Sequence, residues 1–162
     1  MTVTGRPAGP VRGFTLIELM IVVALIATLA AIAAPKFAEL ITLSKEGTTK
    51  GNLGRLRSAL NIYYSDMEGY FPSSGLNFNT SPWTGLSTSL VPKYINTIPT
   101  AKLRNHQELS TVYMHSWSQA HTHDGGFGNW GYDGYTPATA DWGRVWLWCT
   151  HTDHHGQQWS SF

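Results

Sequence analysis

The stretch that most limits the fold of this chain is an apolar run from Phe14 to Ala34, in which Glu18 is the only ionisable side chain. At about 1.5 Å per residue, a helix over this run is about 30 Å long, which is the thickness of a bilayer's hydrocarbon core. A charge inside such a helix costs roughly 2.5–3.5 kcal/mol on insertion scales, so Glu18 needs a partner. The run therefore predicts a membrane-spanning helix over residues 14–34 with one functional carboxylate.

The start of the run resembles the signature of type IV prepilins and of the related type II secretion pseudopilins. The resemblance rests on Gly13, Phe14 and Glu18 in register with the apolar residues that follow. It implies that a prepilin peptidase cuts after Gly13 and that the new N-terminal residue, Phe14, is methylated. Glu18 then becomes the fifth residue of the product. Pro35 falls at a position where many family members also carry a proline.

Two other interpretations of the segment fit less well. Secretory signal peptides have apolar cores of about 7–15 residues, shorter than this run, with the cleavage site after the core. A plain single-pass anchor would leave Glu18 unexplained.

Glu18 and Pro35 are the candidate assembly residues. We expect Glu18 to pair with the amine of Phe14 in a neighbouring subunit, because an unpaired charge in a dry filament core costs several kcal/mol. The alternative is that Glu18 only marks the segment for the peptidase or for the assembly platform.

The resemblance and the sequence pattern together predict an α+β, type IV pilin-like fold. Residues 1–13 are the leader, 14–34 the transmembrane helix, 35–69 its amphipathic continuation, and 70–162 an extracytoplasmic globular region of sheet and loops. One helix runs from Phe14 to Glu68 and is ended by Gly69 and Pro72. It packs on a small antiparallel sheet, with a loop-rich C-terminal region. Strands are expected at 111–118, near 128–132 and at 144–150, and a short helix at 84–94.

Aromatic side chains gather in the C-terminal third. In the strand at 144–150, Trp146 and Trp148 alternate with Val145, Leu147 and Cys149, so that one face can be buried while the other presents two indoles. The wider aromatic set can form a core, a subunit interface or a ligand platform; it consists of Trp130, Tyr132, Tyr135, Trp142, Trp146, Trp148 and Trp159.

The charge balance argues against one class of function, and the cysteine content excludes one kind of cross-link. The chain has eleven Lys and Arg against ten Asp and Glu, and nine against ten without Arg6 and Arg12, so nucleic-acid binding is not expected as its main role. Cys149 is the only cysteine, which rules out an intrachain disulfide. We expect it to be a small buried apolar residue; an intermolecular bridge or a reactive thiol are the alternatives.

Two metal hypotheses arise from the C-terminal third. Histidines can bind Zn, Cu or Ni, or they can simply form a solvated surface; the candidates are His121, His123, His151, His154 and His155 with Asp153. Major pseudopilins bind calcium in a C-terminal loop, and that resemblance makes Asp133 and Asp141 the candidate calcium ligands.

The sequence contains no recognisable catalytic motif. The expected function is a structural subunit of a type IV pilus-like filament. The alternatives are a major pseudopilin of a type II secretion system and a membrane-tethered binding module. The resemblance implies as partners other copies of the chain, the prepilin peptidase and methyltransferase, an inner-membrane platform with its ATPase, and minor pilins or pseudopilins.

The short basic flank predicts the orientation in the membrane. Arg6 and Arg12 keep the N-terminus cytoplasmic under the positive-inside rule, so the globular region is periplasmic in the bacterial inner membrane. After assembly it lies in a pilus at the cell surface or in a periplasmic pseudopilus.

Overall fold

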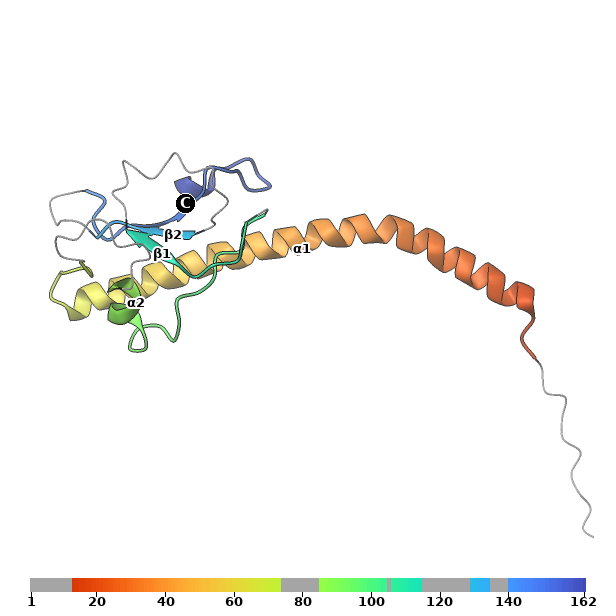
Figure 1. Ribbon diagram of the computed structural model, residues 1–162, viewed down its shortest axis with the longest axis horizontal. Coiled ribbons are helices and arrows are strands. Elements are labelled where there is room, and N and C mark those ends of the chain that lie inside the picture. Colours follow the sequence, from red (N-terminus) through yellow and green to blue (C-terminus); the bar gives the residue numbers. More distant parts are fainter. Residues whose placement is uncertain (1–12, 74–84, 105, 115–128, 135–139) are drawn as a thin grey trace, which may run out of the picture. The chain divides into compact units, whose positions relative to one another are not determined.

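The computed structural model describes residues 13–73, 85–104, 106–114, 129–134 and 140–162. Figure 1 shows the elements, which follow in the order helix α1 (Leu16–Asp66), helix α2 (Gly85–Leu90), strands β1 (Val112–Met114), β2 (Asn129–Tyr132) and β3 (Val145–Trp148), and a short 3-10 helix η2 (Trp159–Ser161). The predicted α+β architecture, a long N-terminal helix and a small sheet, is confirmed. The chain divides into two compact units, Met1–Leu40 and Ile41–Phe162.

Helix α1 is continuous over 51 residues and includes Pro35, as the single-helix prediction required. Its C-terminal end has the predicted glycine cap. Gly69 adopts a φ of 93°, and its N–H donates to the carbonyl oxygen of Tyr64 at 2.9 Å. A residue in the left-handed region that reaches back in this way satisfies a carbonyl of the last turn, and glycine adopts that conformation at no steric cost.

The second unit has one hydrophobic core, against which the C-terminal half of α1 packs. Leu53, Leu56 and Leu60 recur at helical spacing and are at most 3% exposed. They form a single cluster with Leu86 and Leu90 of α2 and with the sheet. Figure 1 shows β1 and β2 alongside this part of α1. The sheet contributes Val112, Trp130, Tyr132, Val145 and Leu147.

The sheet is mixed, with the order β1-β2-β3. Strands β2 and β3 pair antiparallel, with Trp130 opposite Leu147, whereas β1 and β2 pair parallel, with Val112 opposite Trp130. The expectation of an antiparallel sheet is therefore correct for one pair and wrong for the other. Parallel neighbours need a connection of a dozen or more residues, and residues 115–128 supply that length.

Trp146 is buried, which corrects the expectation that β3 presents two indoles. It is 0% exposed, and only Trp148 is partly exposed. Gly131 pairs with Trp146 across the β2–β3 ladder, and a Cβ atom at Gly131 would lie 2.3 Å from the indole. The glycine therefore leaves the space that the Trp146 ring occupies.

Four members of the aromatic set belong to the interior of the second unit. Trp130, Tyr132, Trp146 and Trp159 are at most 2% exposed. The Trp130 indole N–H donates to the carbonyl of Pro99 at 2.7 Å, and the Tyr132 hydroxyl donates to the carbonyl of Pro72 at 2.7 Å. The polar tips of Trp130 and Tyr132 thus find partners inside the protein. Tyr135 lies outside the described residues.

Candidate functional site

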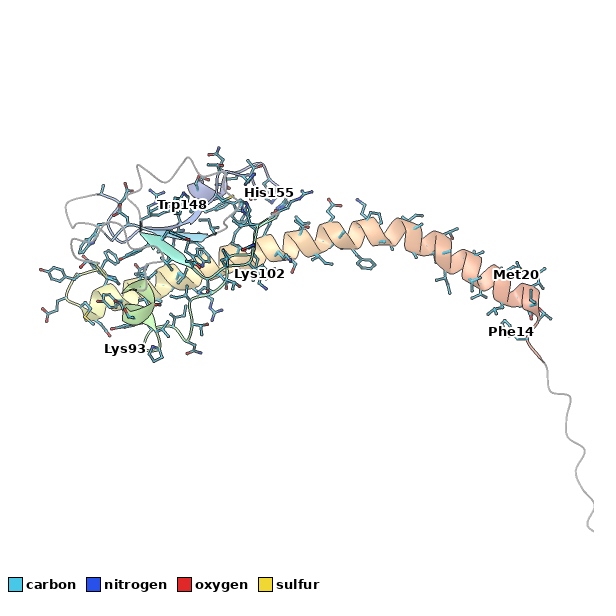
Figure 2. The ribbon with its side chains drawn as sticks, viewed as in Figure 1. Phe14, Met20, Lys93, Lys102, Trp148 and His155 are labelled. Carbon is cyan, nitrogen blue, oxygen red and sulfur yellow. The ribbon has the colours of Figure 1, made fainter. Side chains whose placement is uncertain are left out.

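The first unit presents a continuous apolar surface. Its large apolar side chains between Phe14 and Ile32 are 44–76% exposed, and Figure 2 shows Phe14 and Met20 directed away from the helix. Helix α1 is long and apolar enough to cross a membrane, and its most apolar stretch is not buried in the chain's own fold. An apolar surface of this kind needs lipid or another protein to cover it.

Thr15 and Glu18 cap the N-terminus of α1 reciprocally. The backbone N–H and the hydroxyl of Thr15 donate to Oε2 of Glu18, at 2.9 and 2.6 Å, and the N–H of Glu18 donates to Oγ1 of Thr15 at 3.3 Å. This arrangement is a capping box, which satisfies N–H groups that the helix itself leaves without acceptors. Within one chain, the partner of the Glu18 carboxylate is therefore Thr15.

Sequence reasoning missed Thr15, although a signal was present. A Ser or Thr followed three residues later by Glu, ahead of an apolar run, is typical of a capped helix start.

Gly13 has no packing role among the residues that the structure describes. A Cβ atom placed on it would meet nothing within 4 Å, and the next residue, Phe14, is 76% exposed. The fold itself does not require glycine at this position. Pro35 is exposed inside α1, where it removes one backbone donor, and its role in assembly stays a prediction.

The two candidate calcium ligands flank one turn near β3. Asp141 accepts from the Arg144 guanidinium through Oδ1 at 3.0 Å. Asp133 is buried, and its backbone pairs with the same turn: its N–H donates to Arg144 O at 3.0 Å, and its carbonyl accepts from the Gly143 N–H at 2.7 Å. Calcium binding stays a prediction, and at Asp141 the ion would compete with the Arg144 cation.

The described histidines of this region belong to two side-chain groups, one around His154 and one around His151. His121 and His123 lie outside the described residues. His154 contacts Glu46 of α1. Its backbone N–H donates to Oε2 of Glu46 at 3.2 Å, and its ring Nδ1 lies 2.7 Å from the same oxygen. This pair lies beside the buried carboxylate of Asp153.

Asp153 is held by a cation and two backbone donors. Lys50 Nζ donates to Oδ2 at 2.6 Å, and the N–H groups of His155 and Gln157 both donate to Oδ1 at 2.9 Å. These bonds favour the charged form of the carboxylate and lower the pKa of Asp153 to about 2. The hydrogen bond from Lys50 makes the largest contribution. The carboxylate ties the C-terminal segment to α1.

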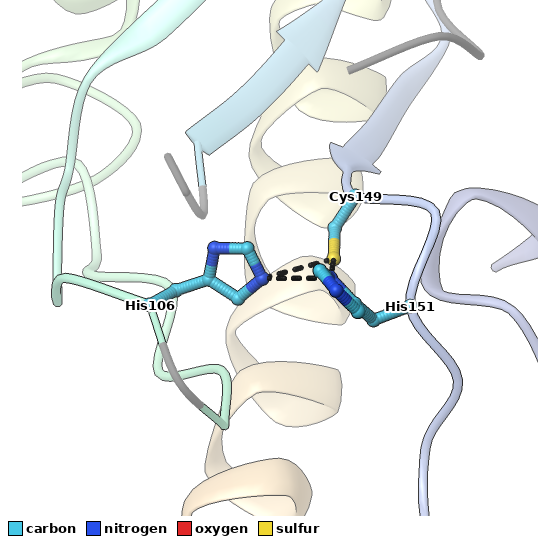
Figure 3. A group of neighbouring side chains, drawn as sticks. All are labelled: His106, Cys149 and His151. Atoms are coloured by element: carbon cyan, nitrogen blue, oxygen red, sulfur yellow. Dashed lines mark hydrogen bonds between the residues drawn. The ribbon is translucent and has the colours of Figure 1, made fainter. Parts of the chain in front are cut away.

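The second group was not predicted as a unit. Figure 3 shows the rings of His106 and His151 and the sulfur of Cys149 directed toward one another. His106 Nε2 lies 3.1 Å from His151 Nδ1, and Cys149 Sγ lies 3.3 Å from each of these nitrogens. Cys149 is buried as expected, at 1% exposed, but its sulfur is in polar contact. His106 is 43 residues away in sequence, so no local spacing links it to Cys149.

The comparison with protein families matches the N-terminal part of the chain. Residues 10–34 match the family described as the prokaryotic N-terminal methylation motif. The type IV major pilin protein PilA of Myxococcus xanthus is 51% identical over 59 residues, which cover 36% of this chain and 27% of that protein. Fimbrial protein EcpC of Eikenella corrodens is 36% identical over 87 residues, which cover 54% of this chain and 52% of that protein.

A third relative is also a fimbrial protein that matches over part of its length. Fimbrial protein Q of Moraxella bovis is 40% identical over 79 residues, covering 48% of this chain and 49% of that protein. The chain thus spans about half, or less, of the length of these relatives. No solved structure matches it significantly. The resemblance to type IV prepilins, read from residues 13–35, is confirmed.

Proposed function

Residues 10–34 carry the prokaryotic N-terminal methylation motif, and on this premise we propose that the chain is a structural subunit of a type IV pilus-like filament, and not an enzyme. The observation that carries the proposal is the exposed apolar first half of α1, which begins within this motif and in which Glu18 is the only carboxylate as far as Ala34. The names of the relatives, major pilin and fimbrial proteins, support it.

Processing would precede assembly. A prepilin peptidase cuts between Gly13 and Phe14, and the new amine of Phe14 is methylated. Before assembly the helix anchors the chain in the inner membrane, with a cytoplasmic N-terminus and a periplasmic globular unit. A membrane platform with an ATPase then adds subunits to a filament of identical copies with minor pilins.

Assembly replaces lipid with neighbouring helices around the apolar surface. In that dry environment the Glu18 carboxylate exchanges its bonds to Thr15 for the amine of Phe14 in the next subunit. Both charges lose hydration on burial, so the pair adds little net stability. Leaving one charge without the other costs several kcal/mol, so the pair selects the axial register of the subunits.

Two variants separate the charge of Glu18 from its capping role. Glu18→Gln removes the charge but keeps an acceptor that can cap the helix, since Gln also serves in capping boxes. Thr15→Val keeps the charge and removes the hydroxyl, at a capping cost of about 1 kcal/mol. We expect filaments from wild type and Thr15→Val, and few or none from Glu18→Gln, counted by electron microscopy of cells that express each chain.

Mass spectrometry and cell fractionation complete this experiment. Glu18→Gln should start at methylated Phe14 and remain in the inner membrane. Normal filament number and length from Glu18→Gln would refute the pairing. An uncut Glu18→Gln precursor would move the role of Glu18 to processing. A wild-type chain that stays monomeric would favour a membrane-tethered binding module over a filament subunit.

A major pseudopilin is the second candidate, because Cys149 is the only cysteine and the C-terminal region cannot close by an intrachain disulfide. Many type IV pilins carry such a disulfide. Shearing cells at native expression distinguishes the two: filaments in the sheared fraction support the pilus, and subunits retained in the periplasm support the pseudopilus.

A further inference from the structure

We propose that His106, Cys149 and His151 bind a zinc ion. The ligand atoms Nε2 of His106, Sγ of Cys149 and Nδ1 of His151 come from two separate segments and face one point (Figure 3). His106 lies between the bridge partners Ala101 and Leu109, and the other two residues follow β3. Two imidazoles and a thiolate are ligands that zinc prefers.

The spacing of the three atoms fits a tetrahedral ion. With bonds of about 2.05 Å to nitrogen and about 2.3 Å to sulfur, tetrahedral angles put two nitrogens about 3.3 Å apart and nitrogen and sulfur about 3.5 Å apart. The corresponding distances here are 3.1, 3.3 and 3.3 Å. Small side-chain rotations would close each difference. Three ligands leave the fourth position for water or a further donor.

The second cluster of potential metal ligands is less suited to a metal ion, because it already contacts a cation. At Glu46, Asp153 and His154, the Lys50 ammonium lies 2.6 Å from Asp153 Oδ2 and already supplies the positive charge. A metal ion at Glu46, Asp153 and His154 would therefore have to displace the Lys50 ammonium.

A zinc ion here would link two parts of the second unit. It would join the segment around His106 to the segment after β3, since His106 and Cys149 are separated by 43 positions in the sequence. A metal that binds the folded chain stabilises it by mass action, and the thiol proton is released to solvent on binding. The inference concerns the second unit alone and stands independently of filament assembly.

The test uses the full chain in detergent, reduced and stripped of metal with a chelator. We expect one zinc ion per chain by calorimetry, and a rise in Tm on the order of 10 °C when zinc is at a hundred times its Kd. Cobalt(II), a spectroscopic substitute for zinc, should give a sulfur-to-metal charge-transfer band and the intense visible bands of tetrahedral coordination.

Three variants locate the ion. Cys149→Ser should abolish the charge-transfer band and weaken zinc binding at least about 100-fold. His151→Gln, at an exposed position where folding is not at risk, should weaken binding similarly while the band remains. His155→Gln is the matched control, because this exposed histidine lies in the same segment and stacks on His154 with centroids 3.7 Å apart, outside the trio.

Circular dichroism confirms that each variant is folded. Binding that is lost equally in His155→Gln, or unchanged in His151→Gln, would place the ion elsewhere and overturn the proposal. No zinc binding by the wild-type chain would show that the three side chains form a hydrogen-bonded trio only. Binding of copper(II) but not zinc would overturn the assignment of the metal.

Discussion

Gly13 is the proposed cleavage residue, and its surroundings in the described structure do not require a glycine. Gly13→Val should leave an uncut precursor in the membrane, because a peptidase cleft must admit the backbone closely and glycine offers no side chain. The fold should be unchanged, since a Cβ atom there meets nothing within 4 Å. Mass spectrometry reads the N-terminus. A Gly13→Val chain that still begins at methylated Phe14 would show that the site is assigned wrongly.

Asp153 gives a pH dependence with a defined sign. Its pKa in the folded chain is lowered to about 2, below the ordinary value of a free aspartate, so the folded state binds this proton less tightly than the unfolded chain does. The stabilisation is complete above about pH 4 and is lost as the pH falls toward 2. Tm measured from pH 6 to pH 2 should fall in that window.

Asp153→Asn is the control for this titration. The amide has no proton to gain, so its Tm should be lower than wild type at neutral pH and should change less between pH 4 and pH 2. Parallel curves for the two chains would show that Asp153 is not responsible.

At the scale of elements, the contact between β2 and β3 depends on Gly131. Gly131→Ala places a methyl group 2.3 Å from the Trp146 ring, which must shift in a packed interior. Overpacking of this kind costs about 1–3 kcal/mol, so we expect a lower urea midpoint. Gly54→Ala is the matched control: its added methyl meets nothing within 4 Å, and alanine should stabilise α1 by up to about 1 kcal/mol. An unchanged midpoint for Gly131→Ala would contradict the packing.

The helix was predictable from the sequence, whereas the sheet pairing was only partly so. The apolar run, the stripe at Leu53, Leu56 and Leu60, and the stop at Gly69 are local signals. Alternation along β3 reveals that two faces exist, but it does not reveal what covers the second face. The burial of Trp146 follows from its register with Gly131, which is a property of the pairing.

The candidate sites also differ in how far the sequence alone predicts them. The region of Gly13, Phe14 and Glu18 is a contiguous motif, so the sequence identifies it directly. The grouping of His106 with Cys149 and His151 depends on tertiary structure, since only the last two are neighbours in sequence. The parallel pairing of β1 and β2 is likewise a property of the tertiary structure that the residues of either strand do not reveal.

At the scale of the whole molecule, the hydrophobic core lies entirely within residues 41–162. A fragment of residues 41–162 should therefore fold without the apolar helix and stay monomeric and soluble, because the surface that needs covering has been removed. Size-exclusion chromatography and thermal melts test this, with a Tm within a few degrees of the full chain in detergent. An unfolded or filament-forming fragment would refute the division of roles between the two units.

The hydrogen bonds between Thr15 and Glu18 all lie on the C-terminal side of Gly13. Removing the leader would leave them in place, so precursor and product start the helix in the same way. In the proposed filament, a subunit that leaves would therefore keep its own Thr15 donors, to which the Glu18 carboxylate could return. Departure from such a polymer would then leave no unpaired anion in lipid, so that the membrane could store subunits for a further round of assembly.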